Sequence, residues 1–225
     1  MLALVDDQME DTNVSAALPR RKVTIADLRR VNLGKAFWSA RTDMIQSEAV
    51  RGLVLRYRKN VVQMVATGSG LIFSGQPGVG KTSAAACCLK EAISAGLAVY
   101  FITHPELREL RFEKKDSLFG NGQDGITVRK KVETAQLLVL DGINEPFFTD
   151  NGFGPLQLEE LLVRRFSEKL ATIITTRSAT FKDKKYAELL DVVSQCMVPV
   201  PISGKNMRDD DREALKKRIV GDGDF

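Results

Sequence analysis

Hydrophobic residues follow two patterns that alternate along most of the chain. Short, uniformly apolar runs predict buried strands, and stretches with apolar positions every three or four residues predict helices. The runs that predict strands are residues 71–74, 98–103, 137–141, 172–176 and 197–201. Because helical patterns separate most of these runs, and because the strands are apolar on both faces, we expect an α/β fold with a parallel sheet covered by helices on both sides.

Helical spacing occurs before, between and after the predicted strands. The predicted helices are residues 25–31, 43–65, 81–95, 105–112, 128–134, 156–169, 184–193 and 208–219. Polar stretches that contain glycine, at 113–125 and 144–155, predict loops. Residues 1–19 predict a frayed acidic tail. Ligands of parallel sheets bind beyond the carboxyl ends of the strands, so we expect functional residues there.

Composition narrows the class of protein. The chain has 225 residues, 44% hydrophobic and 28% charged, which is typical of a soluble globular domain with a short extension. No apolar run approaches the roughly 18 residues that span a bilayer, and the N-terminus lacks a signal pattern. We therefore expect a cytoplasmic protein that makes no membrane contact. The three cysteines form no Cys-x-x-Cys pair and there is a single histidine, so a zinc site is not expected.

Charge is unevenly distributed in the first fifty residues. Residues 1–19 contain four acidic residues and no lysine or arginine, whereas residues 20–41 contain seven basic residues and only Asp27 as an acid. The basic stretch also contains Phe37 and Trp38. These rings either anchor the segment to the core or stack on nucleic-acid bases or a partner protein. We interpret residues 1–50 as an N-terminal extension that contacts a partner or DNA.

A phosphate-binding loop follows the first predicted strand. Residues 75–82 read Gly-Gln-Pro-Gly-Val-Gly-Lys-Thr and fit the pattern G-x-x-x-x-G-K-[ST]. Glycines let several backbone N–H groups point at one phosphate chain, and the following helix directs its positive end at the same anion. Lys81 is expected to reach the β- and γ-phosphates of ATP, and Thr82 to hold Mg²⁺. The predicted nucleotide-binding residues here are Gly75, Gln76, Pro77, Gly78, Val79, Gly80, Lys81, Thr82 and Ser83.

A second chemical signal is the aspartate that ends the apolar run 137–140. Asp141 is expected to lie beside the phosphate-binding loop and to bind Mg²⁺ together with Thr82. The next residue is Gly142, where many P-loop enzymes have an acid that polarises the attacking water. Glu145 either reaches in to take that role or is a surface charge. We therefore expect slow ATP hydrolysis, with Lys81 and Asp141 as its catalytic residues.

The end of the next predicted strand, Thr175-Thr176-Arg177, also faces the site. Either threonine can orient a water molecule near the γ-phosphate, or it can simply suit a strand. Of the two, we predict Thr176 as the catalytic residue. Arg177 either faces a phosphate or a partner, or lies exposed.

The order of these motifs resembles the AAA+ helicase-loader ATPases of the DnaC, DnaI and IstB type. The resemblance covers roughly residues 50–208. The segments that carry it are YRKN (57–60), GSGLIF (68–73), GQPGVGKTSAA (75–85), VYFITHPELREL (99–110), LLVLDGINE (137–145) and RRFSEKLATIITTR (164–177).

This resemblance implies a three-layer AAA+ core in residues 51–225, with sheet order 5-1-4-3-2. It also implies a homo-oligomer with ATP at subunit interfaces, contact with single-stranded DNA, and loading of a hexameric replicative DNA helicase. Arg208 matches an arginine that lies near the nucleotide, and Arg164 and Arg165 are candidates for a subunit interface. Two alternatives stay open. One is a transposition helper that binds duplex DNA and a transposase, and the other is an ATP-gated binding module with negligible turnover.

Overall fold

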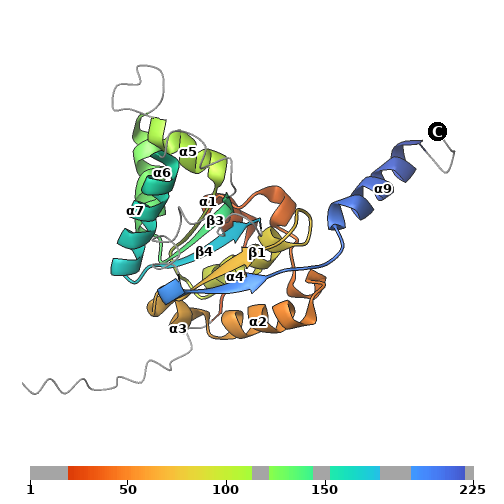
Figure 1. Cartoon of the computed structure of the whole chain (residues 1–225), viewed down its shortest axis with the longest axis horizontal. Helices are drawn as coiled ribbons and strands as arrows, with labels where there is room; N and C mark the ends of the chain where they lie inside the picture. Colours follow the sequence, from red (N-terminus) through yellow and green to blue (C-terminus); the bar gives the residue numbers. More distant parts are fainter. Residues whose placement is uncertain (1–19, 113–121, 144–152, 178–193, 221–225) are drawn as a thin grey trace, which may run out of the picture.

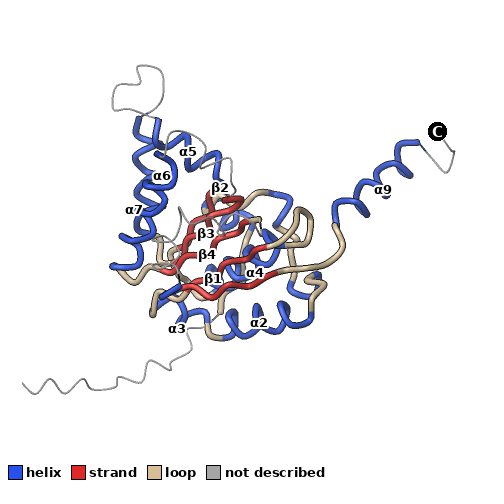
Figure 2. The backbone as a smooth tube through the Cα atoms, viewed as in Figure 1, coloured by secondary structure: helices blue, strands red, loops and turns tan. Residues whose placement is uncertain are grey.

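Five parallel strands form one sheet at the centre of the molecule (Figures 1 and 2). The computed structural model describes residues 20–112, 122–143, 153–177 and 194–220. The strands are β1 (Gly70–Ser74), β2 (Val99–Thr103), β3 (Leu137–Ile143), β4 (Ala171–Thr176) and β5 (Met197–Pro201). Their order is β2-β3-β4-β1-β5, which is the predicted order 5-1-4-3-2 viewed from the opposite edge. The expected α/β class, the AAA+ topology and all five strands are confirmed.

Helices connect the strands and flank the sheet. They are α1 (Ile25–Arg30), α2 (Glu48–Lys59), α3 (Val61–Ala66), α4 (Lys81–Ser94), α5 (His104–Phe112), α6 (Gly122–Thr134), α7 (Phe153–Ser167) and α9 (Met207–Val220). The single helix predicted over 43–65 was wrong. A 3₁₀ turn (Thr42–Met44) precedes α2, and α2 and α3 are separated at Asn60. The helix predicted over 184–193 and the acidic tail lie outside the described residues.

The two faces of the sheet bury alternate residues of each strand. Leu71 and Phe73 of β1 pack with α2, α3 and α4 on one face, whereas Ile72 packs with α5, α6 and α7 on the other. This alternation follows from the pleat, which directs successive side chains to opposite faces. Because both faces are covered, both sets of side chains are apolar. The pattern explains why the strands appear in the sequence as continuous apolar runs.

The two edge strands of the sheet, β2 and β5, make different hydrogen bonds. Beside β2, the backbone N–H of Phe101 donates to the carbonyl of Val31 at 2.9 Å. The Asn32 side-chain amide donates to the carbonyl of Phe101 at 3.2 Å. At the opposite edge, β5 contains Pro199 and Pro201, and Ile202 just beyond it donates to the Ser74 carbonyl at 2.7 Å.

The described part of the N-terminal extension packs against the same core as the sheet. Leu28 and Leu33 are buried there, and Phe37 and Trp38 are half-buried against that core. The indole N–H of Trp38 donates to the Leu33 carbonyl at 2.8 Å. The anchoring interpretation of the two rings is confirmed, while a boundary after residue 50 stays a prediction. None of the described helices combines the length and the apolar character needed to cross a membrane.

Candidate nucleotide-binding site

The glycine-rich loop joins the end of β1 to the start of α4. Gly78 and Gly80 have φ angles of 81° and 93°, a region that favours glycine because it has no Cβ. Space is also limited, since a Cβ at Gly78 would lie 1.5 Å from Oδ1 of Asn206. Val79 is buried and anchors the loop, whereas Gln76 and Pro77 are exposed. The loop therefore presents its backbone at the N-terminus of α4, where backbone amides suit an anion.

Lys81 begins α4 and bends back over this loop. Its ammonium donates to the carbonyls of Gly75 and Gln76 at 2.8 and 2.7 Å. Burial lowers the pKa of Lys81, Asp141 opposes that effect, and the positive charges of Arg208 and Arg177 lower it further. Three cations therefore influence one another at this loop, and a polyanion placed between them would relieve their repulsion.

Three elements meet at the carboxylate of Asp141. The hydroxyl of Thr82, on α4, donates to Oδ1 of Asp141 at 2.7 Å. The hydroxyl of Thr175, on β4, donates to the same oxygen at 2.7 Å, and the N–H of Gly142 donates to the Thr175 hydroxyl at 2.9 Å. A bulge in the pairing of β3 with β4, between Leu140 and Ile143, places Asp141 and Gly142 at this position.

This cluster fits the magnesium ion that accompanies ATP. Mg²⁺ prefers hard oxygen ligands and takes one or two from the protein, with phosphate and water supplying the rest. Thr82 and Asp141 bring one hydroxyl and one carboxylate into contact. The two residues predicted for the metal therefore lie together, and their donor chemistry suits the ion.

Other predicted residues lie elsewhere. The hydroxyl of Thr176 is buried and donates to the Ile143 carbonyl at 2.5 Å. Its predicted catalytic role stays a prediction, while Thr175 holds the position next to the carboxylate. Ser83 is half-buried in the first turn of α4. Glu145 lies outside the described residues.

Residues 206–208 lie against the loop. Arg208 was predicted to lie near the nucleotide, whereas Asn206 and Met207 were not assigned to the site. The N–H of Met207, the first residue of α9, donates to the Gly78 carbonyl at 3.0 Å. The Asn206 side-chain oxygen accepts from the N–H of Arg208 at 3.2 Å, and Arg208 is exposed beside it. Gly204 and Asn206, which precede the last predicted helix, indicated a turn at this place, because both residue types are typical of turns.

The prediction that Arg165 serves a subunit interface was wrong, because its side chain is 1% exposed. The guanidinium spans the start of β4 and the end of α6. It donates to Thr172 Oγ1 (2.9 Å) and to the carbonyls of Val132 (2.9 Å), Glu133 (3.5 Å), Ala135 (2.9 Å) and Ala171 (2.8 Å). Burial lowers the pKa of Arg165. Arg164 is exposed and pairs with Glu133 at 3.5 Å.

Comparison with known proteins gives three consistent matches. The family model described as IstB-like ATP binding protein matches residues 51–214. The replicative helicase loader DnaC of Escherichia coli K12 is 25% identical over 134 residues, which are 60% of this chain and 53% of the relative. The ATP-binding protein of an IS21-like insertion sequence from Bacteroides fragilis is 29% identical over 157 residues, 64% of this chain and 55% of the relative.

Solved structures agree on the fold. The structure of DnaI superposes with a TM-score of 0.58 at 20% identity, covering 78% of this chain and 94% of that one. The structure of the replication initiator DnaA bound to AMPPCP and single-stranded DNA superposes with a TM-score of 0.56 at 15% identity, covering 78% of this chain and 53% of that one. The chain spans about half the length of the curated relatives that it matches.

Proposed function

Since the chain belongs to the IstB-like family of ATP-binding proteins, within the AAA+ class, we propose that it binds ATP with Mg²⁺ at residues 75–82 and hydrolyses it. The observation that supports this most is the meeting of Thr82 and Asp141 at 2.7 Å. Residues 59 positions apart in the sequence thereby supply the two protein oxygens that a nucleotide-bound magnesium ion requires.

Each side chain has a distinct task in this proposal. The loop amides and the Lys81 ammonium hold the phosphates, Lys81 exchanging the carbonyls of Gly75 and Gln76 for phosphate oxygens. Thr82 and Asp141 hold the metal, which when bound neutralises charge on the β- and γ-phosphates. Thr175 fixes the orientation of the Asp141 carboxylate through its hydrogen bond to Oδ1. Arg208 and Arg177 add positive charge around Lys81.

Hydrolysis is expected to be slow. The residue after Asp141 is Gly142, which has no side chain to polarise water and whose N–H is engaged by Thr175. Thr176 and Glu145 remain the catalytic candidates beyond the cluster. A protein of this design acts mainly as a nucleotide-dependent switch, and turnover resets it.

We propose further that the switch loads a hexameric replicative helicase onto single-stranded DNA, working as a homo-oligomer. A relative that matches 60% of the chain is named a replicative helicase loader. The DnaA structure, bound to single-stranded DNA, shares the fold. The basic stretch 20–41, whose net charge is +6 from seven basic residues and one acid, supplies phosphate contacts that weaken with salt.

A transposition helper is the second candidate, and a specific observation favours it. The IS21-like ATP-binding protein matches with higher identity and over more residues than the helicase loader, 29% over 157 against 25% over 134. In that case the DNA is duplex and the partner is a transposase.

Two measurements test these proposals. Phosphate release is compared with and without Mg²⁺, single-stranded DNA and duplex DNA, using Asp141→Asn as the inactive reference. Magnesium-dependent release that Asp141→Asn abolishes supports the ATPase, and tight ATP binding without release identifies a binding module. Immobilised protein is then offered a purified replicative helicase and a transposase in the presence of ATP. Selective capture of the helicase supports the loader, and selective capture of the transposase with a duplex preference overturns it.

A further inference from the structure

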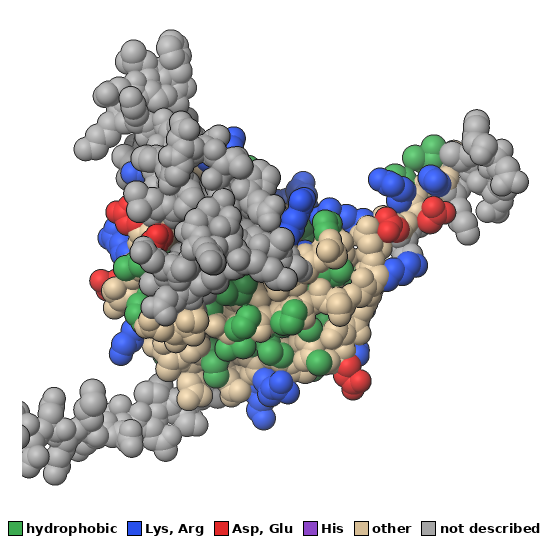
Figure 3. Space-filling view, viewed as in Figure 1, with side chains coloured by type: hydrophobic (Ala, Val, Ile, Leu, Met, Phe, Trp, Pro, Cys, Tyr) green, Lys and Arg blue, Asp and Glu red, His purple; other side chains and the backbone are tan. Residues whose placement is uncertain are grey.

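The C-terminal helix α9 carries an apolar stripe that stays exposed among the residues that the structure describes. Figures 1 and 3 show α9 projecting away from the sheet and its helices, with hydrophobic side chains among charged ones. Leu215 is 52% exposed and Ile219 is 73% exposed. Residues four positions apart share one face of a helix, so these two form a continuous stripe that water would otherwise solvate.

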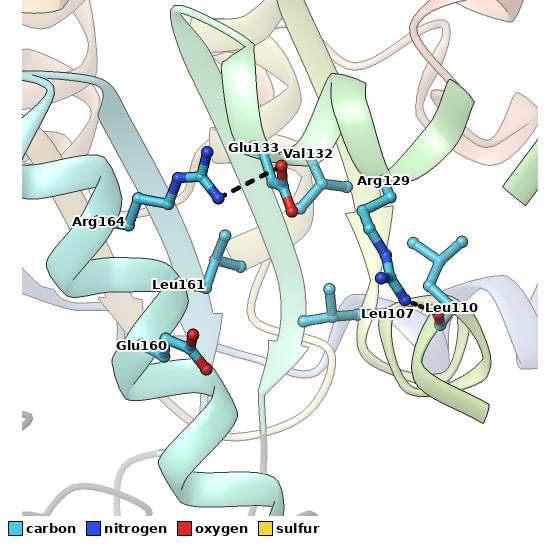
Figure 4. Close-up of a pocket in the computed structure, with 8 residues that line it drawn as sticks. All are labelled: Leu107, Leu110, Arg129, Val132, Glu133, Glu160, Leu161 and Arg164. Carbon is cyan, nitrogen blue, oxygen red and sulfur yellow. Dashed lines mark hydrogen bonds and ion pairs between the residues drawn. The ribbon is translucent and has the colours of Figure 1, made fainter. Parts of the chain in front are cut away.

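A groove of matching character lies between α5, α6 and α7. It has a volume of about 270 Å³, and its apolar lining consists of Leu107, Leu110, Val132 and Leu161. In Figure 4, Leu161 on α7 and Leu107 on α5 point toward one another across this space. Charged side chains on the rim are Arg129, Glu133, Glu160 and Arg164. An apolar floor with a polar rim is the usual make-up of a protein-binding surface.

The charges around the stripe complement one carboxylate of this rim. Arg164 is paired with Glu133 at 3.5 Å, and Arg129 donates to the Leu110 carbonyl at 2.8 Å. Glu160 has no ion pair with the residues that the structure describes. At about 100° per residue, three basic residues of α9 flank Leu215 on both sides. They are Arg212, Arg218 and Lys216, and Lys216 also pairs with Glu213 of the same helix at 3.9 Å.

The two surfaces belong to opposite sides of one molecule. Figure 1 places α5, α6 and α7 on one side of the sheet and α9 beyond the other. The stripe therefore cannot reach the groove of its own chain, and only a second copy can bring the two together. Such a contact joins different surfaces of the two partners, which is a heterologous arrangement that leaves one stripe and one groove free at the ends.

We propose that α9 of one copy docks its Leu215–Ile219 stripe into the α5–α6–α7 groove of a second copy, with Lys216 and its basic neighbours near Glu160. The proposal concerns only these two surfaces and does not rest on ATP hydrolysis. The Met207 N–H bond to the Gly78 carbonyl (3.0 Å) ties the root of the docking helix to the phosphate loop, so nucleotide is expected to change the strength of association.

Sedimentation velocity over a range of concentrations tests the contact. Leu215→Asp with Ile219→Asp should abolish association, because two carboxylates would enter the apolar groove. The matched control is Leu55→Asp, which alters a leucine on α2 that is 48% exposed. Association that survives the paired substitution, or that Leu55→Asp abolishes equally, overturns the proposal.

A mixing experiment gives a sharper result. Glu160→Lys should weaken association at least tenfold through the groove, and Lys216→Glu in the same chain should restore it. The stripe variant and the Glu160→Lys variant should each be monomeric alone. A mixture of these two variants should form a one-to-one dimer, because the stripe variant keeps an intact groove and the Glu160→Lys variant keeps an intact stripe. Failure of the second charge to restore association overturns the assignment of Glu160. The Lys81→Ala variant should associate as the wild type does when nucleotide is absent. Failure of the proposed ATPase function can therefore be distinguished from failure of this contact.

Discussion

The same two strands, β3 and β4, carry a polar cluster at each end, and the two clusters differ in how completely they are satisfied. At the amino ends, Arg165 makes five hydrogen bonds and is 1% exposed. At the carboxyl ends, Asp141 is half-buried, and among the described residues the hydroxyls of Thr82 and Thr175 both donate to one of its carboxylate oxygens.

The difference separates a structural cluster from a functional one. A buried guanidinium whose donors are all engaged holds α6 and β4 together and has nothing left to offer a ligand. A carboxylate to which the described residues donate on one oxygen only, beside a loop that suits phosphate, leaves its second oxygen to the magnesium ion that we propose. Substitutions at the two ends should therefore affect different properties, stability at one and chemistry at the other.

The largest effect is expected for Arg165→Met. Methionine removes one donor from each of the carbonyls of Val132, Ala135 and Ala171 in a buried place, where a group left unsatisfied costs about 1–3 kcal/mol. We expect the free energy of unfolding to fall by about 3–5 kcal/mol in urea denaturation, since some groups will find water. Arg164→Met, at an exposed position, is the control and should change it by about 0.5 kcal/mol or less. Equal losses in the two variants would contradict the comparison.

Lys81→Ala should leave folding intact and remove activity. The ammonium lies at the phosphate loop, and loss of one such group typically lowers turnover by about 10²–10³-fold. Phosphate release and fluorescent-nucleotide binding measure the effect. Lys59→Ala, which removes an exposed lysine from α2, is the matched control. Unchanged ATP affinity and turnover in Lys81→Ala would contradict the proposal that residues 75–82 bind the phosphates of ATP.

Asp141→Asn should separate nucleotide binding from metal use. Asparagine keeps an oxygen for the Thr82 and Thr175 hydroxyls but lacks the charge that holds Mg²⁺. We expect the apparent magnesium affinity and the turnover to fall by about 10–100-fold, with nucleotide binding in EDTA unchanged. A magnesium titration of phosphate release gives both values, and wild-type values would place the metal ligand elsewhere.

The smallest effects should distinguish the two threonines of β4. Thr175→Val removes a hydrogen bond to a carboxylate, worth about 1.5–3 kcal/mol, and should reduce turnover about tenfold or more. Thr176→Val removes a bond to the Ile143 carbonyl and should chiefly lower stability, by about 1 kcal/mol. Parallel assays of turnover and urea unfolding settle the point. A larger loss of turnover in Thr176→Val would restore its predicted catalytic role.

The fold could be predicted because its signals are local and repeated. Apolar runs such as 137–140, separated by helical patterns, are typical of covered parallel strands, and the glycine-rich loop at 75–82 fits the P-loop motif. The threonine pair was harder to resolve. Both Thr175 and Thr176 are buried, so the period of two gave no indication of which one faces Asp141. Only the pairing of β4 with β3, across a bulge, decides it.

Arg165 could not be predicted for a different reason. In the sequence it stands beside Arg164 near the end of a helix, where two basic residues are typical of an exposed face. Its burial depends on carbonyl groups of α6 that lie about thirty positions earlier. Hydrogen bonds between residues so far apart produce no periodic pattern in the sequence. The contact between Met207 and Gly78 was missed likewise, because it joins residues far apart in the sequence.

The prolines of β5 limit how copies of this protein can join. Ile202 donates toward β1, so by strand alternation the nitrogens of Pro199 and Pro201 face outward. Proline has no N–H, and the outer rim of the sheet therefore lacks donors at alternate positions. A strand from another polypeptide would find too few partners to extend the sheet there. At this edge, therefore, a second copy cannot extend the sheet, and any contact made there has to use helices and loops.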